Sequence, residues 1–390
     1  MRWQSRDAVL AVCTLALFVT VFGRLAISPV VPEISETFEV SNGRIGLALS
    51  GMWLAYALTQ FPSGVLADRY GDRPVILLSI GGTAAATLAI VAAPAFGVFL
   101  LGTVLLGALA GLHYSVATTL ITRLYDDIGT AIGIHNGGAP LAGLVAPVVV
   151  AWAVVRYGWR VAVGLTVLVA VPTLLLAIRG IRTREPRTPD RPMRDVFAIG
   201  PIRRLLSRPP VLFTGAIAVL TEFTWQSLAS FLPTFLVRYH GHSTTLAGTL
   251  FGVYFLTQGI LQIGVGRLAD RFGRDPAIGG CMAAGIAGIA LLIAATGLPA
   301  IVVGCLLLGL GMSWGAAVFP RFIDRLTPAE RSFGFGLFRT TYMTIAASGS
   351  VVVGVLADLF GWGVSVGSLA GLLAVVGLLL AGNAALGSGY

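Results

Sequence analysis

Long apolar runs, separated by short polar segments, recur along the whole chain. Each run is about 20 residues long, the length that an α-helix needs to cross the hydrocarbon core of a bilayer. The runs predict spans near 8–31, 43–66, 74–93, 97–122, 129–154 and 159–179, and then near 211–236, 246–267, 276–295, 299–320, 333–357 and 362–382. The pattern therefore predicts an all-α membrane protein with 12 transmembrane helices.

Only one polar segment is long, and it divides the spans into two sets of six. Residues 181–210 are rich in arginine and proline, which favours an irregular connection over a helix. We therefore expect an N-terminal six-helix bundle over 1–180, a cytoplasmic linker over 181–210 and a C-terminal six-helix bundle over 211–390.

Composition and charge support this interpretation. Apolar residues make up 56% of the chain and charged residues 11%, against about a quarter charged in ordinary soluble domains, so a soluble globular protein is excluded. The net charge of +9 comes from arginines that gather in alternate loops, which indicates a membrane topology and not nucleic-acid binding. The positive-inside rule predicts a multi-pass protein of the cell membrane, in contact with its lipids, with both termini in the cytoplasm.

A short charged segment occurs twice. The sequence GVLADRYGDRP at 64–74 recurs as GRLADRFGRDP at 266–276, after the second predicted span of each half. Glycine permits a tight turn and a close helix approach, and Asp beside Arg offers a charge pair at a helix end that can hold one conformation. A single copy would be an ordinary charged turn, but two copies favour a role in conformational gating. The residues expected to serve it are Gly64, Asp68, Arg69, Gly71, Arg73, Gly266, Asp270, Arg271, Gly273 and Arg274.

This segment resembles the loop signature of the major facilitator superfamily, Gly-x-x-x-Asp-Arg-x-Gly-Arg-Arg, and the arrangement of six plus six spans extends the resemblance over the whole chain. Each copy departs from the signature once, because Asp72 and Asp275 replace a basic residue. The resemblance implies two pseudo-symmetric bundles around a central cavity that opens alternately to either side. It also implies a monomeric secondary transporter of a small molecule and not an enzyme.

Three charged residues stand out because they lie within predicted spans and away from the span ends, where a charge costs about 2.5–3.5 kcal/mol on insertion scales and usually has a function. They are Arg24, Glu222 and Arg339. A guanidinium in this position can bind a substrate anion or pair with another helix, and the segment around Arg24 resembles the organic-anion-transporting branches of the superfamily. Trp225 stands where the organophosphate carriers need a second arginine, which favours a monoanion.

Glu222 can bind and release a proton, or it can neutralise Arg24. His113 is the other candidate for proton coupling, and His135 resembles it; either histidine can instead be a packed hydrogen-bonding residue. We expect the remaining substrate contacts among polar and aromatic residues of the second half, although packing alone would also explain the aromatic ones. With the two arginines, the expected substrate-binding residues are Arg24, Trp225, Gln226, Tyr254, Gln258 and Arg339.

Two alternatives stay open. The segment GGAP at 137–140 resembles in part the motif of drug and proton antiporters, which makes efflux of a drug or metabolite the second hypothesis, although a closely packed helix explains the same residues. The third is a sensor of the same fold that transports nothing. The chain has no lysine and no phosphate-binding loop, so protons or another ion must drive transport, and we expect no cofactor and no metal. The substrate, the direction and the coupling ion are not determined.

Overall fold

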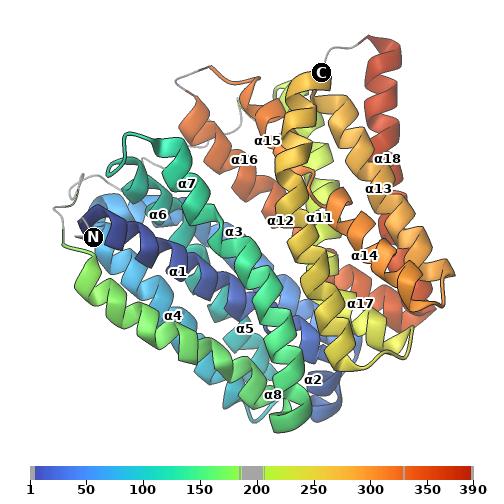
Figure 1. Cartoon of the computed structure of the whole chain (residues 1–390), viewed down its shortest axis with the longest axis horizontal. Helices are drawn as coiled ribbons and strands as arrows, with labels where there is room; N and C mark the ends of the chain where they lie inside the picture. The colour runs from blue at the N-terminus through green and yellow to red at the C-terminus, as the bar shows by residue number, and fades with distance from the viewer. Residues whose placement is uncertain (1–4, 184–185, 187–204, 206, 328–329, 388–390) are drawn as a thin grey trace. The chain divides into compact units, whose positions relative to one another are not determined.

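The computed structural model describes residues 5–183, 186, 205, 207–327 and 330–387, and in this part of the chain all regular secondary structure is helical. The first half contains α1 (Ser5–Leu25), η1 (Ser28–Val30), α2 (Val31–Phe38), α3 (Asn42–Tyr70), α4 (Asp72–Val91), α5 (Phe96–Gly111), α6 (His113–Thr122), α7 (Ile128–Asn136) and α8 (Gly138–Gly180). The second half contains α11 (Pro209–Arg238), α12 (Thr244–Phe272), α13 (Arg274–Ala294), α14 (Leu298–Gly311), α15 (Gly315–Ile323), α16 (Arg331–Ala346), α17 (Gly349–Phe360) and α18 (Trp362–Leu386). Figure 1 shows these helices in chain order.

Ten stretches of the described residues are long and apolar enough to cross a membrane. One of them, 128–180, contains both the fifth and the sixth predicted span, because α8 continues through a kink at Gly158, where φ is 76° and ψ is 165°. Helix α3 covers the second predicted span but is not among the ten, since Ser50, Gln60 and Pro62 interrupt its apolar residues. The protein is therefore an all-α, multi-pass membrane protein, as the sequence predicts.

The chain divides into two compact units. The N-terminal unit consists of residues 1–40 and 47–198, and the C-terminal unit of residues 41–46 and 199–390. Most of the predicted linker, namely 184–185, 187–204 and 206, lies outside the described residues. The predicted bundle boundaries at 180 and 211 therefore stay a prediction.

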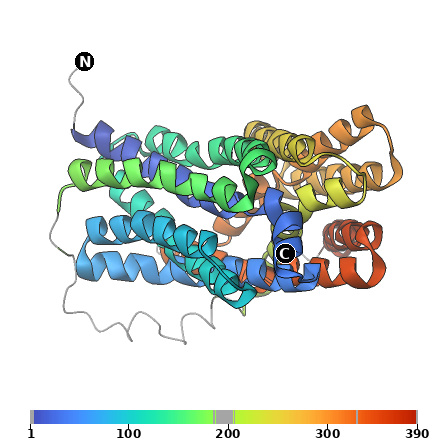
Figure 2. The same cartoon turned by 90° about the horizontal axis from the view of Figure 1, so that it is seen from below.

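In the N-terminal unit, α1 and α4 pack along α8, and the three helices lie side by side in both views (Figures 1 and 2). Small residues allow close contact: a Cβ at Gly138 would lie 2.6 Å from the Thr14 carbonyl oxygen, and one at Gly107 would lie 2.0 Å from that of Met52. Such contacts stabilise membrane helices, which have no hydrophobic effect to bring them together.

In the C-terminal unit, α13 packs against α14 and α18, and α12 packs against α14. Glycines again permit the approach, since a Cβ at Gly311 would lie 2.6 Å from the Cα of Gly285. Large apolar side chains face outward from both units, among them Leu168, which is 69% exposed, and Leu378, which is 72% exposed. An apolar exterior of this kind fits a lipid environment and not water.

Candidate functional site

The repeated segment forms the same sharp turn in both units. Gly71 precedes α4 with φ 94° and ψ 157°, and Gly273 precedes α13 with φ 99° and ψ 158°. Only glycine adopts this conformation readily, so the backbone explains the second glycine of each copy. The close helix approach expected of the first glycine is not observed among the described residues: a Cβ at Gly64 would meet none of their atoms within 4 Å, and one at Gly266 would lie 3.9 Å from Ala316 Cβ.

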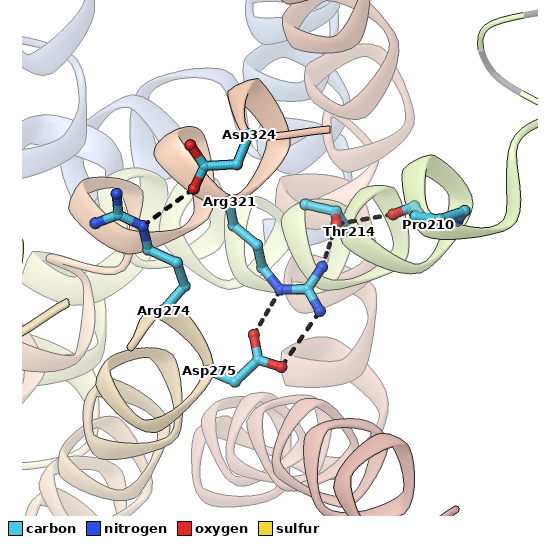
Figure 3. A network of polar contacts seen from close by, with 6 residues as sticks. All are labelled: Pro210, Thr214, Arg274, Asp275, Arg321 and Asp324. Atoms are coloured by element: carbon cyan, nitrogen blue, oxygen red, sulfur yellow. Dashed lines mark hydrogen bonds and ion pairs between the residues drawn. The ribbon is translucent and has the colours of Figure 1, made fainter. Parts of the chain in front are cut away.

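The two acidic residues that depart from the superfamily signature both bind an arginine from the helix pair that follows. In the N-terminal unit, Arg123 Nη1 lies 3.2 Å from Asp72 Oδ2. In the C-terminal unit, Arg321 Nε and Nη2 donate to the two carboxylate oxygens of Asp275 at 2.6 and 3.3 Å, and Arg321 Nη1 donates to the Thr214 hydroxyl (Figure 3). The departures therefore supply carboxylates that connect α4 to the end of α6 and α13 to α15.

The expected charge pair between neighbouring Asp and Arg takes a different form in the C-terminal copy. Asp270 accepts a hydrogen bond from Arg274, one helical turn further on, and Arg274 also donates to Asp324 at 3.4 Å (Figure 3). The guanidinium carbon of Arg271 lies 5.1 Å from the centre of the Phe272 ring. In the N-terminal copy, Arg73 Nη2 donates to the Ile178 carbonyl at 3.0 Å.

Arg24 is buried near the end of α1 in a cage of aromatic side chains. The residue is 6% exposed, and its Nε donates to the Thr20 carbonyl at 3.0 Å. Its guanidinium carbon lies 3.8 Å from the centre of the Tyr56 ring and 5.2 Å from that of Trp53, both on α3. Aromatic faces attract cations, so the two rings hold the guanidinium in place and retain its charge inside the unit.

Glu222 is 7% exposed on α11 and accepts a hydrogen bond from Gln226 Nε2 at 2.9 Å, one turn along the same helix. The fully buried Tyr254 of α12 lies close enough for the Glu222 charge to act on its phenol group. The Tyr254 hydroxyl has no hydrogen-bond partner within the described residues. The structure thus brings Glu222 and Gln226 into contact on α11, with Tyr254 on the neighbouring helix α12.

The other predicted substrate contacts lie in the same unit. Trp225 Nε1 donates to Gln258 Oε1 at 3.2 Å, and Gln258 Nε2 donates to the Met312 carbonyl at 2.8 Å, in the interruption between α14 and α15. Arg339 lies half-buried on α16. Five of the six predicted contacts therefore belong to the C-terminal unit, and Arg24 belongs to the N-terminal one.

His113 and His135 lie together in the N-terminal unit, and both are fully buried. Their ring centres are 5.5 Å apart. The three cysteines, Cys13, Cys281 and Cys305, are free and buried, and the described residues contain no group of three or more His, Cys, Asp or Glu that could hold a metal ion.

A sequence profile described as Major Facilitator Superfamily matches residues 13–243 and 215–384. The chain belongs to this superfamily. A similar protein is the transcription regulatory protein OpdE of Pseudomonas aeruginosa, which is 30% identical in an alignment that covers 97% of this chain and 92% of OpdE. The hexuronate transporter of Bacillus subtilis is 23% identical, over 59% of this chain and 56% of that protein.

Solved structures of superfamily transporters have the same fold. A bacterial homolog of the human lysosomal transporter Spinster superimposes with a TM-score of 0.81 at 18% identity, over 97% of both chains. Superfamily transporters move small molecules across membranes and are generally not enzymes. Two features expected from the sequence are thus shown, namely the fold and the class of protein.

The glycine-proline segment that resembles the antiporter motif of the superfamily has a packing role. Helix α7 ends at Asn136, and α8 begins at Gly138, directly against the α1 backbone. A side chain at Gly138 would collide with the Thr14 carbonyl, so contact between α1 and α8 is sufficient to require a glycine here.

Sequence reasoning missed the aromatic cage of Arg24 and the partners of Asp72 and Asp275. Trp53 and Tyr56 are three residues apart on α3 and thus on one face, a spacing that could have indicated a cation site. Arg123 and Arg325 hold equivalent places in the repeat, but the partner of Asp275 is Arg321, one turn earlier. Only the fold shows which arginine reaches the carboxylate.

Proposed function

We propose that this protein is a secondary transporter that carries a small organic anion across the cell membrane by alternating access, driven by protons. The observation that carries the proposal is the buried Arg24 guanidinium, held against the faces of Tyr56 and Trp53. A permanent positive charge inside a membrane-spanning unit is costly, and binding of an anionic substrate is a function that repays it.

The predicted substrate contacts of the C-terminal unit other than Arg339 are uncharged, which favours a substrate with one negative charge over one with several. The part of the molecule that the structure describes provides indole, amide and phenol groups around Trp225, Gln258 and Tyr254, and these groups recognise neutral parts of a ligand. The similarity to a hexuronate transporter agrees with this class, since a hexuronate is a sugar that carries one carboxylate.

Glu222 is the residue that we propose to bind the coupling proton. The residue is 7% exposed, and its carboxylate accepts a hydrogen bond from the Gln226 amide, one turn along the same helix. A carboxyl in such a site can take up a proton when the surrounding cavity closes and release it when water enters.

Uptake of a labelled monocarboxylate or sugar acid into proteoliposomes tests both residues. Arg24→Lys retains the charge but loses the planar fork, so anion binding should weaken about tenfold or more. Glu222→Gln should abolish uptake against a gradient and spare exchange, which needs no net movement of protons. Thr20→Ser, next to Arg24, is the matched control and should behave as the wild type. Accumulation by Glu222→Gln under an imposed pH difference would contradict proton coupling through this residue.

We propose a topology with both termini in the cytoplasm and a monomer as the working unit. The three native cysteines are buried, so single introduced cysteines can be labelled against a low background. Arg238→Cys, in an outside loop of the proposed topology, should react with an impermeant reagent added to intact cells. Arg182→Cys should react only after the membrane is permeabilised. Equal labelling of both positions from outside would refute this topology.

A second function is supported by one finding, the similarity over 97% of the chain to a protein described as a transcription regulatory protein. A transport fold that binds its ligand and signals its presence would bind the same anion without moving it. A thermal-shift screen with anionic metabolites would detect binding in both cases. Proteoliposomes then separate them, because a sensor would bind a ligand but show neither uptake nor exchange.

A further inference from the structure

Two helix interruptions in the N-terminal unit bring a pair of histidines together. Helix α5 ends at Gly111 and α6 begins at His113, while His135 lies in the last turn of α7, before the interruption at Gly137. Both residues are fully buried, their ring centres are 5.5 Å apart, and the ring planes meet at 51°. The two imidazoles are therefore direct neighbours inside the unit.

The hydrogen bonds determine where a proton can bind. His113 Nε2 lies 3.1 Å from the Cys13 carbonyl oxygen on α1. A carbonyl oxygen only accepts, so this nitrogen carries the hydrogen, and a neutral His113 has its lone pair on Nδ1. Nδ1 of His113 has no hydrogen-bond partner in the described part of the chain, and neither ring nitrogen of His135 forms a hydrogen bond of ordinary geometry there, although the Cys13 carbonyl lies near His135 as well. The pair thus contains buried nitrogen lone pairs that accept no hydrogen bond from the described residues.

Two other titratable groups lie beside the pair. They belong to Cys13 on α1, whose carbonyl binds His113, and to Tyr114 on α6, whose ring centre is 6.0 Å from that of His135. Asp72 of α4 lies near enough to Cys13 for its charge to act on the thiol. Helices α5, α6 and α7 carry no carboxylate and no guanidinium. On the other helices of the unit, the charged residues are Arg6, Asp7 and Arg24 of α1, Glu33 and Glu36 of α2, Arg44, Asp68 and Arg69 of α3, Asp72 and Arg73 of α4, and Arg156, Arg160 and Arg179 of α8.

We propose that His113 and His135 form one proton-binding site, in which a single proton is shared between His113 Nδ1 and a ring nitrogen of His135. With one proton added, one ring donates an N–H to the lone pair of the other, so both rings gain a hydrogen-bond partner. The carbonyl end of α7 favours a positive charge on His135. A second proton is opposed by the first, because two cations 5.5 Å apart inside the unit repel each other. The pair therefore titrates as a unit and takes up one proton.

The site differs from Glu222 in residue type and lies in the other unit. Its role in transport rests on the proposed function: a proton bound between α6 and α7 would bias the arrangement of two helices that are both interrupted beside a histidine. The binding of the proton itself does not depend on transport.

The chain has four histidines, which makes a direct test practical. His240 and His242 lie between α11 and α12, and replacing both by Gln leaves only the buried pair. The full-length variant, with nitrogen-15 histidine in lipid nanodiscs, is titrated by NMR. We expect the two imidazoles to shift over the same pH range with a total uptake of one proton. Independent titration of the two rings, or no titration of either while the protein stays folded, would overturn the proposal.

Single variants in the same background sharpen the result. His113→Gln keeps a donor for the Cys13 carbonyl, and it should move the titration midpoint of His135 by removing its partner; His135→Gln should do the same for His113. Tyr114→Phe retains the neighbouring ring and both imidazoles, so it should preserve the joint titration. A midpoint that is the same with and without the partner histidine would show that the rings do not share a proton.

Proteoliposome uptake then tests the role in transport. Replacing both His113 and His135 by Gln should flatten the pH dependence of anion uptake at least severalfold, while exchange at constant pH continues. An unchanged pH profile would overturn the transport role of the pair. If the wild type transports nothing, the proposed function fails, and the NMR titration still decides whether the proton site exists.

Discussion

The two units build the same helical turn with different charged residues. Gly71 and Gly273 have almost the same backbone conformation, and in each unit an Asp in the next turn binds an arginine further along the chain. The buried member of the pair differs, because Asp72 is 6% exposed beside a 32% exposed Arg123, whereas Arg321 is 4% exposed beside a 36% exposed Asp275. The repeat has thus retained a backbone turn and an acid–arginine contact, but not the positions of the charges.

A second contact shows the same divergence at the start of the first helix of each unit. In the N-terminal unit, Tyr125 donates its hydroxyl to Asp7 at 2.8 Å. In the C-terminal unit, Arg208 donates to both carboxylate oxygens of Glu330 at 3.1 and 2.6 Å. The first contact connects α1 to the segment before α7 through a phenol. The second connects the start of α11 to the residue before α16 through a guanidinium.

The largest effects should come from removing the exposed member of each buried pair. Asp275→Asn removes the carboxylate charge that the buried Arg321 binds, and Arg123→Gln removes the guanidinium that the buried Asp72 binds, so each should lower the free energy of unfolding by about 3 kcal/mol. The reverse variants, Arg321→Gln and Asp72→Asn, leave an exposed charge and should cost about 1 kcal/mol. Thermal unfolding in detergent would measure all four. Equal losses within each pair would show that burial does not control the energy.

The turn glycines should behave alike in the two units. Gly71→Ala and Gly273→Ala place a side chain in a conformation that nearly only glycine adopts, so each should lower the free energy of unfolding by about 1–3 kcal/mol. Gly64→Ala, where a Cβ meets no neighbour within 4 Å, is the matched control and should be neutral or slightly stabilising. A difference between the two turn variants would mean that the repeats are not equivalent at this position.

The signature aspartates should affect turnover more than stability. Asp270→Asn weakens the pair between Arg274 and the 71% exposed Asp270, worth less than about 1 kcal/mol, and we expect Asp68→Asn to be comparably mild. Because both residues are proposed to act in conformational exchange and not in binding, turnover should fall severalfold with little change in substrate affinity. Asp324→Asn, which also loses a contact with Arg274, is the control. Loss of binding in a folded Asp68→Asn would contradict this role.

The smallest effects should appear at the extremes of pH and should differ between the units. The Arg208 guanidinium lowers the pKa of Glu330 from 4.5 to about 2. A lowered pKa means that the contact contributes its full stability above pH 4.5 and loses it as the pH falls towards 2. The unfolding midpoint of Glu330→Gln should therefore fall less in acid than that of the wild type. Parallel acid profiles would show that the pair adds no stability.

The hydrogen bond between Tyr125 and Asp7 in the N-terminal unit should be lost at high pH. Burial, and then the hydrogen bond to Asp7, raise the pKa of Tyr125 from 10.0 to about 12. A raised pKa means that the contribution is complete below pH 10 and is lost as the pH rises through about 12. Tyr125→Phe should remove this step from the alkaline unfolding profile. An alkaline profile identical to that of the wild type would exclude the contact as its cause.

Much of the fold was predictable because a bilayer restricts the chain so strongly. Spanning helices must satisfy their own backbone hydrogen bonds, so apolar runs of fixed length indicate the helices directly. The helix interruptions beside His113 and Gly137, and the continuation of α8 through Gly158, were not predictable, since tertiary packing and not hydropathy determines where an apolar helix bends. Of the site, the sequence indicated Arg24, Glu222 and His113 because polar residues are rare within apolar runs.

By itself, the sequence determined the class of protein, the repeat and the residues worth testing, because each depends on the types of residue along the chain. Only the tertiary structure decided their partners: Tyr56 and Trp53 around Arg24, Gln226 beside Glu222, His135 beside His113, and Arg321 on Asp275. Most of these contacts join residues far apart in the chain. Which side chains meet there depends on the rotation and the crossing of packed helices, and small residues such as Gly138 allow that packing without indicating its partners.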